Sequence, residues 1–379
     1  MSTLARTPLH DWHSANNGRM VDFAGWSMPV QYGSIVAEHH ATRRAAGLFD
    51  ISHMGRIDIH GEGAQDLLEC LLTRRVSDMR PGQIRYSLMC NAEGGVLDDV
   101  LAYRASEEGA PGGGSPLFQG PMHLVVNAGN RAKLIDWITD RQVEFAARIE
   151  DLTTQTAMIA VQGPKAIGIV QAMADRPIDG LKNYTGMAAK VDGVDCYASR
   201  TGYTGEDGVE LICASPEAPA LWEKLHAAVV AAGGSAVGLA ARDTLRLEAA
   251  MPLFGHELSE EITPSQAGLG FAVNLKGREF IGSEAIAQSG EEAHPTRVGL
   301  VLDGKRSPRQ GYPVMAGDAQ VGVVTSGGYS PTLDRPIAMA YVGPTMHAVG
   351  TGLEVDLRGQ RLHATVVELP FYRRPSSSK

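Results

Sequence analysis

Two adjacent carboxylates, Asp98 and Asp99, lie inside the apolar run "VLDDVLAYR" at residues 96–104. Successive side chains on a strand point to opposite faces, so each acid shares its face with apolar neighbours. A carboxylate on such a face needs a partner, a solvated cleft or a proton, because burying it alone is very costly. We interpret Asp98 as a turn or strand-edge acid paired with a backbone amide or an arginine. Asp99 is the candidate for chemistry, because its face also carries Tyr103 and the neighbouring strand "IRYSLM" can place Tyr86 nearby.

A third acid, Glu210, lies inside the short run "VELIC", where it points either to solvent or into a pocket. In a pocket, its carboxylate could accept two parallel N–H bonds from a planar, amidine-like edge of a ligand. Arg242 lies in the first turn of a helix predicted in "VGLAARDTLRLEAAMPLFGHEL", which Pro252 is expected to end. A cation there opposes the helix dipole by roughly 0.3–1 kcal/mol. We therefore expect a compensating anion, which could be Asp243, Glu210 or a ligand.

Other charged residues in these segments are expected to be solvated. Arg246 is interpreted as a surface cation, and Glu206 and Asp207 as turn residues of the loop "GYTGEDG". The side chains alone thus favour a cleft lined by Asp99, Glu210, Arg242 and tyrosines, suited to a cationic or amidine-containing small molecule.

The elements that position these residues show an internal repeat. Residues 56–72 and 158–173 each have an alternating strand, a glycine and an amphipathic helix, with Gly61 and Gly163 at equivalent places. Farther along, "GGVLDDVLAYR" and "TGEDGVELICAS" resemble a second pair of equivalent strands. The simplest account is a duplicated α+β unit whose two copies face one another across a cleft.

The remaining chain predicts three further features. The Gly/Pro-rich stretch 105–121 reads as a long loop between the two strands of a hairpin, and a helix with an asparagine cap follows from Asn130. After a short helix and a polar connector at 275–297, short alternating runs between Gly turns extend from 298 to 369. These runs predict a small antiparallel barrel or sandwich.

Composition excludes several classes of function. With 34 Lys and Arg against 43 Asp and Glu, the chain lacks the excess of positive charge that is typical of proteins that bind nucleic acid. No apolar run approaches the ~20 residues of a membrane span, and the amino-terminal stretch has no hydrophobic signal region, so we expect a cytoplasmic protein. No G-x-S-x-G elbow, P-loop or strand-linked G-x-G-x-x-G is present.

Metal and redox chemistry also have little support. The four cysteines form no C-x-x-C pair and are interpreted as buried, reduced thiols. The adjacent pair His39 and His40 lacks the i, i+4 spacing and third ligand of a helical metal site. We expect no metal.

Six motifs in order along the chain resemble the T-protein family of the glycine cleavage system, whose members are aminomethyltransferases. They are "MVDFAGWSMPVQY", "GLFDISHMG", "GGVLDDV", "SRTGYTGEDGVEL", "GLAARDTLRLEA" and "TSGGYSPTL". The resemblance runs from about Thr7 to Tyr372. The stretch "EEGAPGGGSPLFQG" is longer than the connection usual in this family.

The resemblance implies a cloverleaf-like α+β fold with tetrahydrofolate in a central cavity. Residues 1–280 would form the folate-binding region from two intertwined α+β lobes, and residues 298–370 a carboxyl-terminal antiparallel β-barrel. The implied reaction belongs to glycine catabolism. The one-carbon unit of the aminomethyl-dihydrolipoyl H protein passes to tetrahydrofolate, giving 5,10-methylenetetrahydrofolate and ammonia.

Site residues carry over by motif. The essential acid of the family falls on Asp99, the pterin-recognising glutamate on Glu210, and the arginine of "LAARD" on Arg242. Cavity-lining positions fall on residues of four motifs: Met54, Tyr86, Asn127 and Tyr203. The resemblance implies that Asp99 stabilises iminium-like charge and positions or receives a proton at N10 of the folate, while Asp98 is structural.

Three alternatives differ in what they require. A tetrahydrofolate-dependent demethylase on the same scaffold would keep the folate cavity but not a lipoyl-protein docking surface. A non-catalytic folate-binding accessory protein would have no use for a charge-stabilising acid such as Asp99. A purely structural protein would leave charges in a cleft without a purpose.

Overall fold

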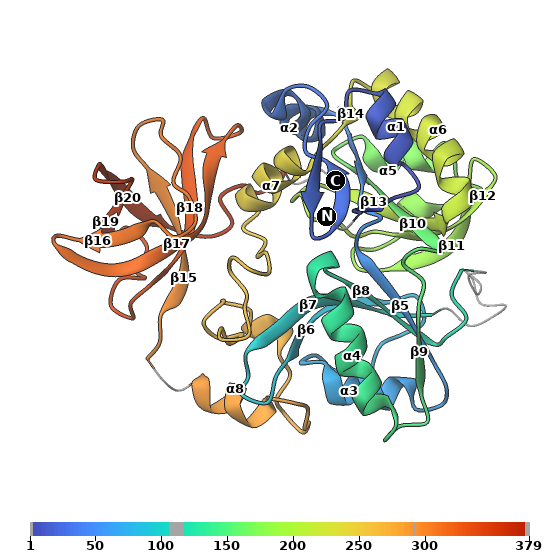
Figure 1. Cartoon of the computed structure of the whole chain (residues 1–379), viewed down its shortest axis with the longest axis horizontal. Helices are drawn as coiled ribbons and strands as arrows, with labels where there is room; N and C mark the ends of the chain where they lie inside the picture. Colours follow the sequence, from blue (N-terminus) through green and yellow to red (C-terminus); the bar gives the residue numbers. More distant parts are fainter. Residues whose placement is uncertain (1–2, 106–116, 291–292, 376–379) are drawn as a thin grey trace. The chain divides into compact units, whose positions relative to one another are not determined.

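The computed structural model describes residues 3–105, 117–290 and 293–375, and the chain divides into two compact units (Figure 1). The first unit comprises Met1–Met89, Asp98–Gly202 and Glu206–Ala241. The second comprises Cys90–Leu97, Tyr203–Gly205 and Arg242–Lys379. None of the helices in the described part of the chain has the length and apolar character needed to cross a membrane.

The first unit contains a five-stranded sheet in the order β6-β7-β8-β5-β9, which carries the two adjacent acids on β7. Its elements are β5 (Gly55–His60), α3 (Ala64–Leu71), β6 (Ile84–Cys90), β7 (Val96–Arg104), β8 (Met122–Val126), α4 (Arg131–Gln142) and β9 (Arg148–Asp151). Strands β7 and β8 are antiparallel, with Leu101 opposite Val125. The predicted hairpin is therefore confirmed, while residues 106–116 of its connection lie outside the described residues.

A second sheet in the same unit has the order β11-β12-β13-β10-β4-β14. Its elements are β4 (Gly47–Asp50), β10 (Thr156–Gln162), α5 (Ala166–Gln171), β11 (Gly186–Val191), β12 (Val194–Ser199), β13 (Gly208–Ala214), α6 (Ala218–Ala231) and β14 (Ser235–Ala236). The amino-terminal residues form a small three-stranded sheet and two helices: β1 (Ala5–Arg6), α1 (His10–Ala15), β2 (Met20–Phe23), β3 (Trp26–Pro29) and α2 (Ile35–Arg44).

The two sheets confirm the duplication. Strands β6-β7-β8-β5 and β11-β12-β13-β10 have the same order, and each copy continues with a helix and a short strand. The equivalent glycines have positive φ, 97° at Gly61 and 134° at Gly163. An added Cβ would meet the carbonyl oxygen of Ala146 at 2.2 Å in the first case and that of Thr42 at 2.5 Å in the second. Glycine at both turns is thus required by backbone conformation and by close packing.

The second pair of equivalent strands expected from the sequence is wrong. By sheet order the counterpart of β7 is β12, and that of β8 is β13. Both β7 and β13 are strands with an acid after a Gly-rich turn, which is a local pattern that occurs in more than one place in the repeat. Glu210 on β13 is therefore not the structural counterpart of Asp99 on β7.

The two copies meet at buried aromatic side chains. The rings of Tyr103 on β7 and Tyr197 on β12 lie edge to face with centroids 6.0 Å apart, and both are at most 2% exposed. A large apolar core packs on the second sheet, and Trp222 of α6 is its largest fully buried side chain. Because full burial of a large apolar side chain contributes about 1.5–3 kcal/mol, such packing holds the strands that carry the polar site in place.

The second unit contains a closed antiparallel barrel in the order β15-β18-β17-β16-β19-β20, so the barrel and not the sandwich is correct. Its strands are β15 (Thr296–Leu302), β16 (Pro313–Ala316), β17 (Ala319–Ser330), β18 (Arg335–Val342), β19 (Gly352–Asp356) and β20 (Arg361–Val367). Buried Val, Leu and Ala side chains form its core. Helix α8 (Ser283–Ser289) precedes the barrel.

Helix α7 (Leu239–Glu248) carries Arg242 and Arg246. It ends earlier than Pro252, which was expected to stop it, because the chain leaves helical geometry at Ala250 with φ of 54°. Leu247 near its end packs with Ile337 and Met339 of β18.

Candidate active site

One asparagine amide bridges the two acids of β7. Asn127 Nδ2 donates to Asp98 Oδ1 at 2.9 Å and to Asp99 Oδ1 at 2.8 Å. The register of β7 and β8, continued two pairs beyond Leu101 and Val125, sets Asn127 opposite Asp99. Tyr86, on the adjoining strand β6, lies near enough to Asp99 to lower the pKa of its carboxyl. The predicted proximity of Tyr86 to Asp99 is thus confirmed, and Asn127 is brought to the same place.

Asp98 is surrounded by amide donors. Its side chain is fully buried and accepts hydrogen bonds from the Asn127 backbone N–H at 2.9 Å and from Asn130 Nδ2 at 2.6 Å, besides the Asn127 side chain. Over residues 3–105, 117–290 and 293–375, no lysine or arginine forms an ion pair with Asp98 or Asp99. The expected backbone amide partner of Asp98 is therefore confirmed, but its expected place in a turn or at a strand edge is wrong, because Asp98 lies inside β7, between β6 and β8.

Burial raises the pKa of both carboxyls. For Asp98 the neighbouring charge of Asp99 raises it further, while hydrogen bonds from Asn130 and Asn127 lower it. For Asp99 the hydrogen bond from Asn127 and the nearby Tyr86 hydroxyl lower the pKa and so act against burial. Two carboxyls that interact in this way titrate as a pair. Asp99 is partly exposed whereas Asp98 is not, so Asp99 is the member that a ligand can reach.

Glu210 points into the protein. It is 5% exposed, and its Oε2 accepts a hydrogen bond from Thr201 Oγ1 at 2.5 Å. Burial raises the pKa of Tyr103 well above its ordinary value, and the Glu210 charge adds to that rise. Tyr103 lies on the face of β7 that carries Asp99. Of the two alternatives left by the sequence, solvent or a pocket, exposure to solvent is wrong.

Arg242 and Tyr203 lie together in the second unit. The guanidinium carbon of Arg242 lies 4.9 Å from the centroid of the Tyr203 ring, which is a cation–π geometry. The Tyr203 hydroxyl donates to the carbonyl of Pro252 at 2.5 Å and so fixes the ring. Arg242 occupies the first turn of α7 as predicted, but Asp243, one of its expected partners, binds Arg246 instead at 2.7 Å.

Met54 is half-buried in the turn between β4 and β5, and a buried arginine that sequence reasoning missed shapes this turn. Arg56 is fully buried, and its guanidinium donates to the carbonyls of Met54 at 2.6 Å, Ser52 at 3.1 Å and Thr156 at 2.9 Å. The only signal for it was a cation in the alternating run "RIDIH". Its carbonyl partners come from two distant segments, which the sequence does not show to be adjacent.

Three charged residues expected in solvent are buried or paired, so those expectations are wrong. Arg246 is 2% exposed and donates to Glu257 at 3.0 Å and to Ser326 at 2.8 Å. The Glu206 side chain is 4% exposed and pairs with Arg43 at 3.0 Å, and Asp207 pairs with Arg200 at 2.6 Å. The partners named here lie outside the helix or loop that carries the charged residue, so a local sequence pattern does not reveal them. Asp243, which also binds Arg246, is the exception, because it lies on the same helix.

The cysteines are free thiols, of which Cys90, Cys196 and Cys213 are buried and Cys70 is partly exposed. His39 is buried, and its ring contacts that of His40 with centroids 5.6 Å apart.

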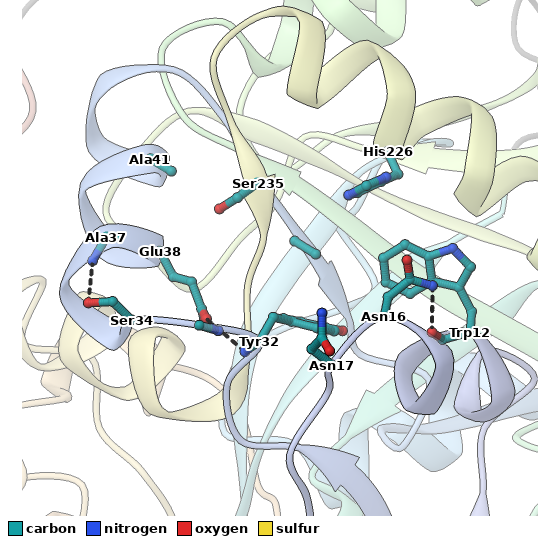
Figure 2. A pocket seen from close by; sticks show the side chains of 12 residues that line it. Trp12, Asn16, Asn17, Tyr32, Ser34, Ala37, Glu38, Ala41, His226 and Ser235 are labelled. Carbon is teal, nitrogen blue, oxygen red and sulfur yellow. Dashed lines mark hydrogen bonds between the residues drawn. The ribbon is translucent and has the colours of Figure 1, made fainter.

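A separate cavity of about 540 Å³ opens between α1, α2, α6 and β14 (Figure 2). Trp12 and His226 face it from one side and α2 from the other, with Tyr32 between them. The Tyr32 hydroxyl lies 2.8 Å from His13 Nδ1, and His13 Nε2 lies 2.9 Å from Asp50 Oδ2. None of the predicted site residues lines this cavity.

Comparison with known proteins matches both parts of the chain. Residues 9–277 match the family model described as the GCVT N-terminal domain, and residues 296–373 match the glycine cleavage T-protein C-terminal barrel domain. The chain is 46% identical over 377 residues to an aminomethyltransferase of Streptomyces coelicolor, covering 98% of each. It is 43% identical over 374 residues to an aminomethyltransferase of Geobacillus kaustophilus, covering 98% of this chain and 99% of the relative.

A solved structure agrees. The fold is similar to the crystal structure of glycine cleavage system aminomethyltransferase T from Bartonella henselae, with a TM-score of 0.89 and 34% identity, covering 98% of this chain and 99% of that one. With both domains matched in order and nearly full-length relatives above 40% identity, the chain belongs to the glycine cleavage T-protein family.

Proposed function

We propose that this protein is the aminomethyltransferase of a glycine cleavage system. It takes the aminomethyl group from the dihydrolipoyl arm of the H protein and transfers the one-carbon unit to tetrahydrofolate. The products are 5,10-methylenetetrahydrofolate, ammonia and the free dihydrolipoyl H protein. Nearly full-length similarity to aminomethyltransferases supports the assignment. We further propose that residues 1–280 bind folate, that residues 298–370 form the barrel domain, and that the protein acts in the cytoplasm.

The observation that carries the mechanism is the amide-bridged pair of acids on β7. Asp99 is partly exposed and receives hydrogen bonds from neutral groups, so its negative charge is not neutralised by a cation among the described residues. Loss of ammonia or thiolate from the one-carbon unit develops iminium-like positive charge. A carboxylate held in place before the reaction stabilises that charge without reorganisation. Asp99 is also the group that positions or accepts the proton of N10 as the new C–N bond forms.

Glu210 is proposed to recognise the pterin. Tetrahydrofolate presents N3–H and its 2-amino group side by side, and a carboxylate accepts such an edge through two parallel hydrogen bonds. Thr201 holds one oxygen of Glu210, which pre-orients the carboxylate. Arg242 would hold this carboxylate or the pterin carbonyl. The other folate contacts are proposed at four residues: Met54, Tyr86, Asn127 and Tyr203.

The test of function is tetrahydrofolate-dependent release of ammonia from aminomethylated H protein. We expect wild-type protein to release ammonia stoichiometrically with 5,10-methylenetetrahydrofolate, and only when both substrates are present. Folate binding with turnover of a small methylated sulfur or methoxy compound, but not of H protein, would assign a demethylase. Folate binding without turnover of either donor would assign an accessory protein.

The Glu210→Gln variant tests recognition separately from chemistry. The amide keeps the size of the side chain but presents a donor to a donor edge of the ligand. We expect KM for tetrahydrofolate to rise about 10- to 100-fold, because a buried N–H of the ligand loses its acceptor. An unchanged KM would exclude Glu210 from the pterin site.

A further inference from the structure

We propose that Asn130 is a positioning residue for one-carbon transfer, which acts through Asp98 to make Asp99 a stronger proton acceptor. This inference rests on the proposed function. It adds a role for Asn130 and assigns Asp98 a task beyond the structural one expected from the sequence.

The side chain of Asn130 does not make the hydrogen bond that is usual for an asparagine at the start of a helix. It is the residue before α4, where an asparagine normally accepts a hydrogen bond from a helix N–H. The Asn130 side chain makes no capping bond. Its Nδ2 instead donates to Asp98 Oδ1 at 2.6 Å, and the Asn130 side chain is 5% exposed. The Asn130 side chain thus binds a buried acid in place of a helix N–H.

Every recorded partner of Asp98 is a donor. Asn130 and the Asn127 side chain donate to Oδ1, and the Asn127 backbone donates to Oδ2. An ionised carboxylate accepts all three bonds, whereas a protonated one would turn an O–H toward an N–H. This arrangement therefore favours the ionised form of Asp98.

The same amide connects the two acids. Asn127 Nδ2 contacts Oδ1 of both Asp98 and Asp99, so a charge held on Asp98 lies close to the carboxylate of Asp99. Among the described residues, the charge of Asp99 acts on Asp98, and Tyr86 on β6 acts on Asp99. The interaction between two charges is mutual, so a charge on Asp98 also acts on Asp99. A like charge nearby favours protonation of its neighbour. Asn130 thus strengthens Asp99 as the acceptor of the N10 proton by stabilising the charge on Asp98.

The experiment is a titration of the Asp99 carboxyl in the full-length protein without substrates. Aspartate labelled with carbon-13 at the carboxyl group gives the signal by NMR, and the Asp99→Asn variant assigns it. In Asp98→Asn, the Asp99 signal is expected to titrate about one pH unit lower than in wild type, because the neighbouring charge is gone. In Asn130→Ala, it should move in the same direction by a smaller amount.

The double variant Asp98→Asn/Asn130→Ala decides whether Asn130 acts through Asp98. We expect it to titrate like Asp98→Asn alone, whereas independent effects would add. An equal shift from Asn130→Ala in both backgrounds would overturn the proposal, as would an Asp99 titration unmoved by Asp98→Asn. The latter result is decisive even if Asn130→Ala fails to fold. Asn16→Ala is the matched control, because it removes a side-chain amide bond to Trp12 away from the pair and should leave the titration unchanged.

Activity is then compared with the titration. With aminomethylated H protein and tetrahydrofolate, we expect the acid limb of the kcat–pH profile to shift in the same order as the NMR titrations. Displaced titrations in a protein that transfers no one-carbon unit would refute the proposed function and leave the electrostatic link from Asn130 to Asp99 intact. Transfer of the one-carbon unit with an unmoved Asp99 titration would support the proposed function and refute the electrostatic link from Asn130 to Asp99.

Discussion

Strands β4 and β7 of the first unit each carry a buried carboxylate, Asp50 and Asp98, and the neighbours of the two carboxyls shift the pKa in opposite directions. Asp50, at the end of β4, accepts hydrogen bonds from Thr7 Oγ1 at 2.7 Å and the Ser52 N–H at 2.9 Å, and His13 Nε2 lies 2.9 Å away. Burial alone would raise its pKa, but these partners, led by His13, lower it to about 2. On β7, burial and the adjacent Asp99 raise the pKa of Asp98.

The comparison separates an acid whose charge stabilises the fold from the pair of acids proposed to act in the reaction. At Asp50 an imidazole, a hydroxyl and a backbone amide favour the charged form, so ionisation strengthens the fold. At Asp98 and Asp99 two acids share an amide, so ionisation of both weakens the fold. Such an unfavourable arrangement is typical of a site where the charge does chemistry. The following predictions test this distinction.

The largest effect is expected from Asp99→Asn. It keeps the size of the side chain and removes the charge that stabilises the developing iminium. We expect kcat to fall about 10²–10³-fold, which is the usual loss for one pre-oriented electrostatic group. Ammonia release from aminomethylated H protein measures it. The affinity for tetrahydrofolate, measured by calorimetry, should change less than fivefold, and a loss of folate binding would contradict a catalytic role.

The Asp50→Asn variant should lose stability but keep most of its activity. The single oxygen of the asparagine amide cannot replace both carboxylate oxygens, of which one lies beside Thr7 and His13 and the other accepts from the Ser52 N–H. A buried donor therefore loses its acceptor. We expect the free energy of unfolding to drop by about 2–3 kcal/mol, because hydrogen bonds to a charged group are worth about 1.5–3 kcal/mol. Urea denaturation measures the loss. A kcat reduced more than tenfold in the folded variant would show that Asp50 is not merely structural.

The pH dependence of stability should reflect Asp50. Its folded pKa of about 2 lies below the unfolded value near 4, so its contribution is complete above pH 4 and is lost as the pH falls toward 2. One pKa unit corresponds to about 1.4 kcal/mol, so a shift of nearly two units should account for about 2–3 kcal/mol of the loss. Between pH 2 and pH 5, the free energy of unfolding should therefore change less with pH for Asp50→Asn than for wild type. Parallel curves would refute the assignment.

The smallest effect on stability is expected from Asp98→Asn. The amide loses a hydrogen bond to Asn127 but removes a buried charge beside Asp99, so the two contributions oppose one another. We expect the free energy of unfolding at pH 7 to change by no more than about 1 kcal/mol. A raised folded pKa costs stability as the pH rises above 4, so the variant should gain on wild type from pH 4 to pH 7. A gain toward low pH would contradict this sign.

Much of the fold was predictable because it depends on local patterns. The alternating runs and Gly turns of residues 298–369 indicated antiparallel strands, and the strand-glycine-helix pattern at Gly61 and Gly163 indicated the duplication. The chemistry of the site was predictable in part for the same reason. An acid inside an apolar strand, such as Asp99 or Glu210, is visible in the sequence because it breaks the pattern.

Other features depended on which segments meet in space. Arg246 looked like a surface cation on its helix, but Glu257 and Ser326 surround it. Asn130 looked like a helix cap, but the β7–β8 pairing brings Asp98 within 2.6 Å of its amide.

The amino-acid sequence by itself determined the strands, the repeat and which acids lie inside apolar strands, because backbone propensity and alternation act over a few residues. Only the tertiary structure decided which charges are compensated. The pKa of a buried carboxyl depends on groups within a few ångströms, and here those groups come from positions as far apart as His13 and Asp50, or Asp98 and Asn130. Asp50 and Asp98 are both buried aspartates at strand positions, and their neighbours lower the pKa of one and raise the pKa of the other.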